Sequence, residues 1–417
     1  MEGAAEKVKP FKFVLLSMIP FLFLSGCFGK AELEQQAYVV VLGLDKADDN
    51  LVKVTFQIAN PEVGSTGGGA APTEPPSDII SFTASDILSA KELANSVVPR
   101  RLDFGHLQTI IIGEELAKTK LFHHIIASSI VDPEMRRETN LIVSKEKASD
   151  FIHANKPKLE TRPHKFYAFM KQRWRDTGFA PYSNLNRYFQ RLSSELFLSI
   201  YATTDKNETV SKNEVDYEPG QIPQKSGDPV QMIGSAVFKN GKMVGSLTGK
   251  ETRIALFLRH KALNHTFVES FPDPVNDKYR ITLRMTKPTK TRVKINTKKT
   301  PAEVKVTIPI RLQVFSNPSL VNYPTNPANQ KKLRKSIKEN LEKETMDFIK
   351  RTQEEFQSEP FLWYLEARRT FWTMPDYKNY DWEKKYQTAK VDVNYDVTIE
   401  SFGEQLKPAD IDKPGRD

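Results

Sequence analysis

In the first part of the chain, segments whose apolar residues recur with the period of a strand alternate with segments that have the period of a helix. Residues 37–60 contain an apolar run, a polar turn from Asp45 to Asn50 and a return segment of alternating character. The apolar positions of the return segment are Val52, Val54, Phe56 and Ile58. This pattern predicts a β-hairpin whose second strand is half-buried.

The next segments continue the same alternation of strands and helices. Strands are predicted over 78–83, 106–112 and 139–143, and helices over 85–98, 113–130 and from about 147. Ser85 is the expected N-cap of the first helix. Residues 157–200 read as helices and loops. The pattern therefore predicts an N-terminal α/β domain over 27–200, built on the first hairpin.

A polar stretch rich in Asn, Asp, Gly and Pro follows over 201–228, and we predict that it is the main linker. The next unit, 229–265, has a strand on each side of Asn240-Gly241, which is the strongest short hairpin signal in the chain. A helix is expected directly after this hairpin, over about 248–259.

The C-terminal part is predicted to be a second α/β domain over 266–405, with a short tail over 406–417. Several strands are expected between 267 and 314, and a clean alternation from Val391 to Ile399 predicts the last strand. Residues 329–356 predict a long amphipathic helix. Its apolar face contains Leu333, Ile337, Leu341, Phe348, Ile349 and Phe356.

The N-terminus has the order of a secretory signal. Basic residues between Lys7 and Lys12 precede an apolar run of about ten residues, which is too short to span a bilayer. The run ends at Leu24-Ser25-Gly26-Cys27, which holds the only cysteine of the 417 residues and resembles the bacterial lipobox. We therefore expect residues 1–26 to be a lipoprotein signal peptide, and Cys27 to receive diacylglyceryl and N-acyl groups. The alternatives are an ordinary signal peptide, or a core segment with a chance cysteine.

The composition excludes further classes of protein. A single cysteine leaves no disulfide framework, and the net charge of +9 is too moderate for a dedicated nucleic-acid-binding protein. A modest positive charge does favour contact with an anionic membrane surface. The expected protein is thus a globular chain held at the outside of a membrane by its acyl groups.

Motifs for catalysis or for metal and cofactor binding are missing from the sequence. The seven histidines form no HExxH pattern, no GxSxG elbow is present, and Gly67-Gly68-Gly69 is not followed by GK[ST]. The acids at 45, 48 and 49 do not fit an EF-hand loop. We predict no catalytic residue, no metal ligand and no cofactor.

Two basic clusters remain open to interpretation. The first contains Lys287, Lys290, Arg292, Lys294, Lys298 and Lys299, and the second contains Lys331, Lys332, Arg334, Lys335 and Lys338. Each is either a solvated charged face or a contact for a partner or a lipid headgroup.

The order of several short motifs resembles one family. They begin with Cys27 and continue through 32–39, Gly43-Leu44-Asp45-Lys46, 54–61, 110–117 and 132–136. The C-terminal half adds Gly234 to Lys239, Met243-Val244-Gly245 and Glu251-Thr252-Arg253. In this order they resemble the Ger(x)C lipoproteins, which are the C subunits of nutrient receptors in bacterial spore germination.

This resemblance implies a mixed α/β (α+β) fold of three domains, each a β-sheet flanked by helices. It also implies a non-enzymatic receptor subunit that acts beside the polytopic A- and B-type membrane subunits. The expected location is the outer face of the spore inner membrane, with Cys27 as the one chemically defined position. A lipid-anchored solute-binding protein of a transporter and an anchored cell-envelope hydrolase are the alternatives.

Overall fold

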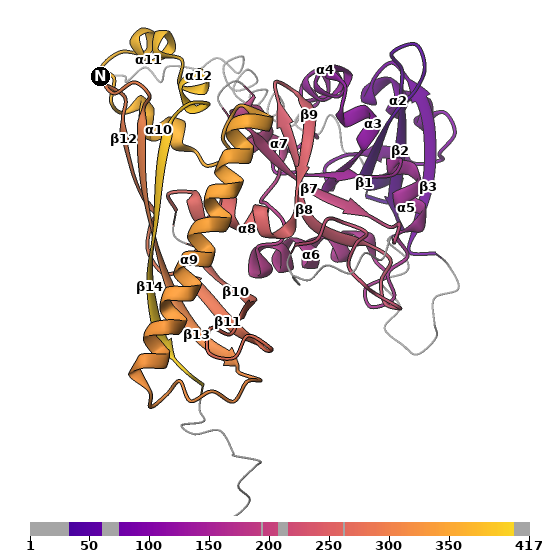
Figure 1. Ribbon diagram of the computed structural model, residues 1–417. Coiled ribbons are helices and arrows are strands. Elements are labelled where there is room, and N and C mark those ends of the chain that lie inside the picture. The colour runs from indigo at the N-terminus through magenta and orange to yellow at the C-terminus, as the bar shows by residue number, and fades with distance from the viewer. Residues whose placement is uncertain (1–32, 61–74, 193–194, 207–215, 262, 404–417) are drawn as a thin grey trace, which may run out of the picture.

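The described residues form two β-sheets, each covered by helices, that lie side by side (Figure 1). The computed structural model describes residues 33–60, 75–192, 195–206, 216–261 and 263–403. The mixed α/β class predicted from the sequence is confirmed.

The first sheet has nine strands in the order β3-β2-β1-β5-β6-β7-β8-β9, with β4 paired to one end of β1. Its centre is parallel, from β1 through β5 and β6 to β7, and its two flanks are antiparallel. The strands are β1 (Gln36–Lys46), β2 (Val52–Ala59), β3 (Ser77–Ala84), β4 (Arg101–Asp103), β5 (Thr109–Gly113), β6 (Asn140–Ser144), β7 (Phe197–Thr203), β8 (Gln231–Lys239) and β9 (Lys242–Leu247). A short 3-10 turn, η1 (Leu33–Gln35), precedes β1.

Helices cover both faces of this sheet, as expected where parallel strands are joined by crossovers. One face packs on α2 (Ile87–Asn95), α3 (Glu114–Ala117), α4 (Lys120–Ser129) and α7 (Leu185–Arg191). The other face packs on α5 (Ala148–Ala154) and α6 (Pro163–Thr177). The central strands β5, β6 and β7 are consequently buried at every residue.

The second sheet has five strands in the order β10-β11-β13-β12, and the last strand, β14, pairs in parallel with β13. The strands are β10 (Leu263–Pro272), β11 (Arg280–Lys287), β12 (Arg292–Asn296), β13 (Glu303–Ser316) and β14 (Lys390–Ser401). The helices are α8 (Gly249–Leu258), α9 (Pro327–Arg351), α10 (Trp363–Arg368), α11 (Met374–Tyr380) and α12 (Trp382–Tyr386). The helix α8 contacts both β8 and β13, and so joins the two sheets.

The long helix α9 crosses the second sheet along β14 (Figure 1). All six apolar residues of its predicted face are buried, and the helix passes into a π-helical turn, η3 (Thr352–Phe356), before it ends. The predicted amphipathic helix is therefore confirmed. The aromatic residues Phe361, Trp363 and Trp382 that follow it belong to the same core, whereas Trp372 is fully exposed.

The described residues form two sheets, whereas the resemblance implies three. The hairpin of β8 and β9 forms as predicted around Asn240-Gly241, but β8 pairs with β7 and completes the first sheet. Residues 197–203, for which the sequence predicts loop and linker, form the strand β7 instead. The domain boundaries themselves stay a prediction.

Two local predictions also differ. The side chain of Asp86, not Ser85, accepts a hydrogen bond from the Ser89 amide and caps α2. The helix predicted over 113–130 is two helices, because the chain breaks at Lys118 and Thr119.

Cys27, the signal segment 1–26 and most of the predicted loop at 61–77 lie outside the described residues. Within the described residues, none of the helices has the length and apolar character needed to cross a membrane.

Candidate functional site

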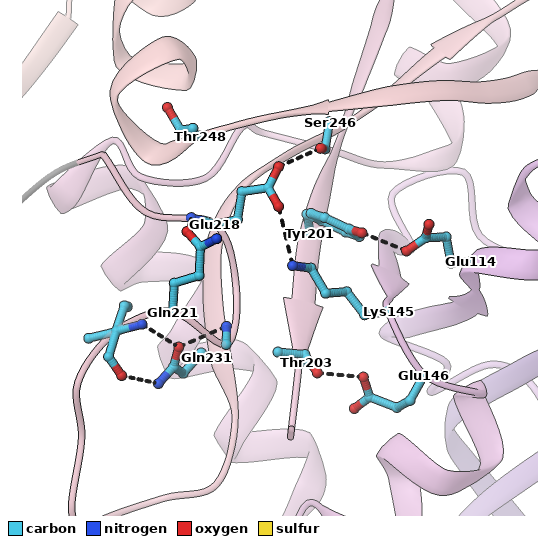
Figure 2. Close-up of polar contacts among 12 residues, drawn as sticks. Glu114, Lys145, Glu146, Tyr201, Thr203, Glu218, Gln221, Gln231, Ser246 and Thr248 are labelled. Atoms are coloured by element: carbon cyan, nitrogen blue, oxygen red, sulfur yellow. Dashed lines mark hydrogen bonds and ion pairs between the residues drawn. The ribbon is translucent and has the colours of Figure 1, made fainter. Parts of the chain in front are cut away.

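The first candidate site is a polar network at the carboxyl ends of β5, β6 and β7 (Figure 2). Open α/β sheets commonly bind ligands at this edge of parallel strands. Glu114 follows β5, Lys145 and Glu146 follow β6, and Tyr201 and Thr203 belong to β7. The segment 216–231 crosses this edge and supplies Glu218 and Gln231.

The acids of this network are bonded to neighbouring side chains and backbone. Glu146 accepts hydrogen bonds from the Thr203 hydroxyl (2.6 Å) and from the Thr204 amide and hydroxyl (both 2.7 Å). The Tyr201 hydroxyl donates to Glu114 at 2.5 Å. Burial and this carboxylate raise the pKa of Tyr201 far above its usual range, so the hydroxyl remains a donor.

Hydrogen bonds also hold the segment 216–231, which crosses this edge of the sheet. Glu218 accepts a hydrogen bond from Ser246 (2.6 Å) and contacts Lys145 (3.3 Å). Gln231 holds the backbone of Gly220 and Ile222. The remaining cavity beside these strands has a volume of about 140 Å³, which is small for an organic ligand. The network thus closes the edge of the sheet instead of opening it to a substrate.

Asp45 has a capping role that the sequence did not indicate. The sequence predicts a place in the hairpin turn, but Asp45 belongs to β1 and is buried. Its carboxylate accepts hydrogen bonds from the amides of Ala148 (2.6 Å) and Ser149 (2.9 Å) at the start of α5. Burial raises the pKa of Asp45, and these two bonds oppose the rise.

The histidine pair His123-His124 has no metal-binding arrangement. The two rings are tilted with centroids 5.9 Å apart, and Nδ1 of His123 lies 3.2 Å from the Tyr188 hydroxyl. Across the part of the chain that the structure describes, no group of three or more His, Cys, Asp or Glu side chains could hold a metal ion.

One lysine of the two basic clusters differs from the other members in its burial. Lys287 is fully buried, and its amine donates to the carbonyl oxygens of Phe257 (2.9 Å) and Arg259 (2.5 Å) at the C-terminal end of α8. A hydrogen-bond donor is favourable there because helix C-termini present unpaired carbonyls, and a neutral amine can donate as an ammonium does. The other lysines and arginines of both clusters are exposed, apart from the partly buried Lys338. Whether they contact a partner or a headgroup stays open.

Lys287 predicts a pH dependence of stability. Burial, followed by repulsion from Arg259, lowers its pKa from 10.5 to about 7. Between these values the unfolded chain binds the proton and the folded chain does not, so the free energy of unfolding rises with pH. We expect the wild type to gain up to about 1.4 kcal/mol per pH unit between pH 7.5 and 9.5, relative to Lys287→Met. Urea unfolding at several pH values measures this gain.

The exposed neighbour Lys290 provides the control for this measurement. Lys290→Met is expected to show the wild-type slope, because it removes an equal charge from solvent. A Lys287→Met protein whose stability runs parallel to that of the wild type across this range would show that the buried amine has an ordinary pKa.

A second group of buried charges lies where the two halves of the molecule meet, with Glu195 of the first half facing Arg259 of the second. Arg191 forms an ion pair with Glu195 at 2.8 Å, and Arg259 donates to the carbonyl oxygen of Pro360 at 3.1 Å. Glu359 accepts from the amides of Phe361 and Tyr364, at 2.6 and 2.7 Å. Burial raises the pKa of both Glu359 and Glu195 above the usual range of a carboxyl group. Sequence reasoning missed this cluster because its members come from distant segments.

These features define a class of protein: a mixed α/β chain with two sheets, joined through a buried ionic cluster, whose polar residues at the sheet edge bond to one another. Two family models match it, "Spore germination protein N-terminal domain" over residues 29–203 and "Spore germination B3/ GerAC like, C-terminal" over residues 233–403. Together they cover most of the chain, which belongs to the Ger(x)C family of spore germination proteins.

Individual relatives match over nearly the full length. Spore germination protein KC of Bacillus subtilis (strain 168) is 25% identical, over 94% of this chain and 96% of the relative. Spore germination protein GerQC of Bacillus cereus is 21% identical, over 93% and 98%. The crystal structure of the GerBC protein has a similar fold, with a TM-score of 0.51 and 16% identity over 86% of this chain and 96% of that chain.

Proposed function

We propose that this chain is a non-enzymatic, lipid-anchored subunit of a nutrient receptor that triggers spore germination. It is held at the outer face of the spore inner membrane by acyl groups on Cys27, beside polytopic A- and B-type membrane subunits. The observation that carries the proposal is the match of both halves of the chain to spore germination domains. The lipobox-like segment before Cys27 supports the anchor.

The polar network supports the non-enzymatic part of the proposal. At the sheet edge where an α/β enzyme would hold its substrate, three carboxylates accept hydrogen bonds from neighbouring hydroxyls. Glu114 accepts from Tyr201, Glu146 accepts from Thr203, and Glu218 accepts from Ser246. None of these hydroxyls is paired with a histidine base that would activate it as a nucleophile. A solute-binding protein would need two similar lobes, but a nine-stranded and a five-stranded sheet differ in size and strand order.

Deletion of the gene tests this function. We expect deletion spores to lose the response to the nutrient of this receptor, measured as the fall in optical density of a spore suspension. Germination by stimuli that bypass nutrient receptors should continue at the wild-type rate, and a wild-type copy should restore the response. Normal responses to every nutrient, in a strain without a paralogue, would show that the receptor assignment is wrong.

A further inference from the structure

An exposed apolar patch lies at one end of the second sheet, where Figure 1 shows α10, α11 and β12 together. At its centre is Trp372, whose side chain is entirely exposed to solvent. Met374 (42% exposed) and Leu365 (39% exposed) line the same surface groove of about 390 Å³. Single apolar residues are common on protein surfaces, but a tryptophan grouped with other large apolar side chains marks a surface that contacts something.

The turn that carries Trp372 is held from both sides. Before it, the hydroxyl and the amide of Thr370 donate to the carbonyl oxygen of Ala367 in α10, at 2.7 and 3.1 Å. After it, the hydroxyl oxygen of Thr373 accepts from the Asp376 amide at 3.2 Å and caps α11. The fold therefore fixes the exposure of Trp372, and a contact made there would not have to order a loose loop.

The turn between β12 and β13 lies against this patch and is strongly basic. The Thr297 hydroxyl is hydrogen-bonded to the Thr370 hydroxyl at 2.9 Å. Residues 290–299, which end in this turn, contain five lysines and arginines, all of them exposed, and no acid. Only Lys299 forms an ion pair among the described residues, with Glu303 at 2.7 Å. The first basic cluster of the sequence is thus placed beside the apolar patch.

The groove itself adds two more cations. Arg368 and Arg369 line it together with the apolar side chains. Arg369 is paired with Glu366 at 2.7 Å, and this pair is close to neutral. Arg368 and Lys298 are exposed and form no ion pair among the described residues. The patch consequently has an apolar tip and a positively charged rim.

This combination suits an anionic bilayer better than a protein partner. Tryptophan is enriched at the interface between lipid and water, and each lysine or arginine near an anionic membrane surface strengthens binding by about fivefold. A specific protein interface covers about 800 Å² on each partner, of which three apolar side chains on one turn supply only a part. Charge complementarity therefore favours lipid headgroups as the occupant.

We propose that this patch is a second membrane contact, made by the folded chain itself. Trp372 enters the headgroup layer of an anionic bilayer, and Arg368 and Lys298 bind lipid phosphates. The inference goes beyond the proposed function, because the contact does not depend on acyl groups at Cys27. An anchor alone limits the distance of the chain from the membrane, whereas a second contact also fixes its orientation.

The fluorescence of the full chain tests this contact, because Trp372 differs from the other tryptophans of the sequence. The other three, Trp174, Trp363 and Trp382, are buried. The chain is purified in a non-ionic detergent and reconstituted, by removal of the detergent, on vesicles of phosphatidylglycerol and phosphatidylcholine. We expect the emission to shift to shorter wavelength and to be quenched by lipids brominated on their acyl chains. Trp372→Ala should lose both responses.

The opposite result is equally clear. Emission that is neither shifted nor quenched by the brominated lipids, while acrylamide in the buffer still quenches it, would show that Trp372 stays in water and would overturn the proposal. Circular dichroism provides the folding control. Trp372→Ala should unfold at the same urea concentration as the wild type, because the side chain is fully exposed.

Paired charge changes test the cationic rim. Arg368→Gln combined with Lys298→Gln should lower the ratio of bilayer-bound to free Trp372 by more than about tenfold. Lys331→Gln combined with Lys332→Gln is the matched control, because it removes the same charge from exposed residues at the start of α9, near the other end of the second sheet (Figure 1). Equal effects of the two pairs, or an equal response on vesicles of phosphatidylcholine alone, would overturn the charged contact.

Reconstitution with the membrane subunits separates a bilayer from a protein as the occupant. Equal quenching by brominated lipids with and without these subunits supports the proposal. A shift that appears only with the subunits, and without quenching by lipid, would assign the patch to a protein contact and overturn it. Since the readout is the position of Trp372 and not attachment to vesicles, a chain without acyl groups on Cys27, or a normal deletion phenotype, would leave these expected results unchanged.

Discussion

Gly234→Ala is expected to lower the free energy of unfolding by about 3 kcal/mol or more. Gly234 lies in β8 with a φ of +82°, a conformation that costs an L-residue about 1–2 kcal/mol. A Cβ atom there would also overlap the carbonyl oxygen of Leu247, where β9 ends before α8. This neighbour is backbone, so it cannot turn aside as a flexible side chain could.

The effect should extend beyond the strand. The Gly234 amide donates to the carbonyl oxygen of Phe179 at 2.7 Å, which ties β8 to the segment after α6. A shift of β8 would therefore disturb both the hairpin and the start of α8, where Thr248 and Glu251 form a capping box. Urea unfolding followed by circular dichroism, compared at equal protein concentration, measures the loss.

Gly403 provides the control that separates backbone conformation from steric overlap. Its φ is +81°, but an added Cβ would have its nearest neighbour, the carbonyl oxygen of Val314, at 3.8 Å. Gly403→Ala should therefore cost only the conformational part, about 1 kcal/mol. If both variants lose the same stability, the overlap with Leu247 contributes nothing and the packing of β8 against the end of β9 is looser than described.

Elements fixed by local signals could be predicted from the sequence. The Asn240-Gly241 turn has φ values of 50° and 80°, which is what a two-residue hairpin requires and what this dipeptide tolerates best. The helix α9 follows from the repeat of its buried apolar residues, which belong to the core of the second sheet. In both cases each determining residue lies within about two turns of the next one along the chain.

The strand β7 could not be predicted in this way. Phe197–Thr203 is buried on both faces and has no alternation, so its pattern does not distinguish a strand from a buried helix. Its parallel partner, β6, lies more than fifty residues earlier. Without β7, the sequence shows no strand with which β8 could pair. The prediction therefore divides a single nine-stranded sheet into two units.

The burial of the charged residues was not predicted from the sequence, for two different reasons. Lys287 does have a sequence signal, since it continues the inward positions Ile281, Leu283 and Met285 of β11. That alternation was outweighed by the run of exposed lysines after it. Arg191 and Arg259 had no such signal, because their burial depends on how the two halves of the chain pack.

Cys27→Ala is expected to abolish stable membrane association. The proposed anchor is close to the fold, since β1 begins at Gln36, nine residues after Cys27. Nine residues span at most about 32 Å when fully extended, so acyl groups on Cys27 would hold the first sheet near the bilayer surface. Tethering at this distance raises the effective concentration of the chain near integral membrane partners, so that weak contacts suffice.

Membrane fractionation and mass spectrometry of the mature N-terminus measure the result. The wild type should begin at an acylated Cys27 and sediment with membranes, whereas Cys27→Ala should be uncleaved or released. Ser25→Ala is the control, because it keeps a small residue before the cysteine and should be processed normally. A mature N-terminus elsewhere, without an acyl adduct, would contradict the anchor.

The germination phenotype of the same variant separates tethering from assembly. If contacts with the membrane subunits persist without the tether, Cys27→Ala spores should respond to the nutrient more slowly than the wild type but faster than deletion spores. A response as poor as that of the deletion would mean that the anchor is required for assembly itself. A wild-type response, with Cys27→Ala absent from the membrane fraction, would show that the chain acts without being held at the membrane.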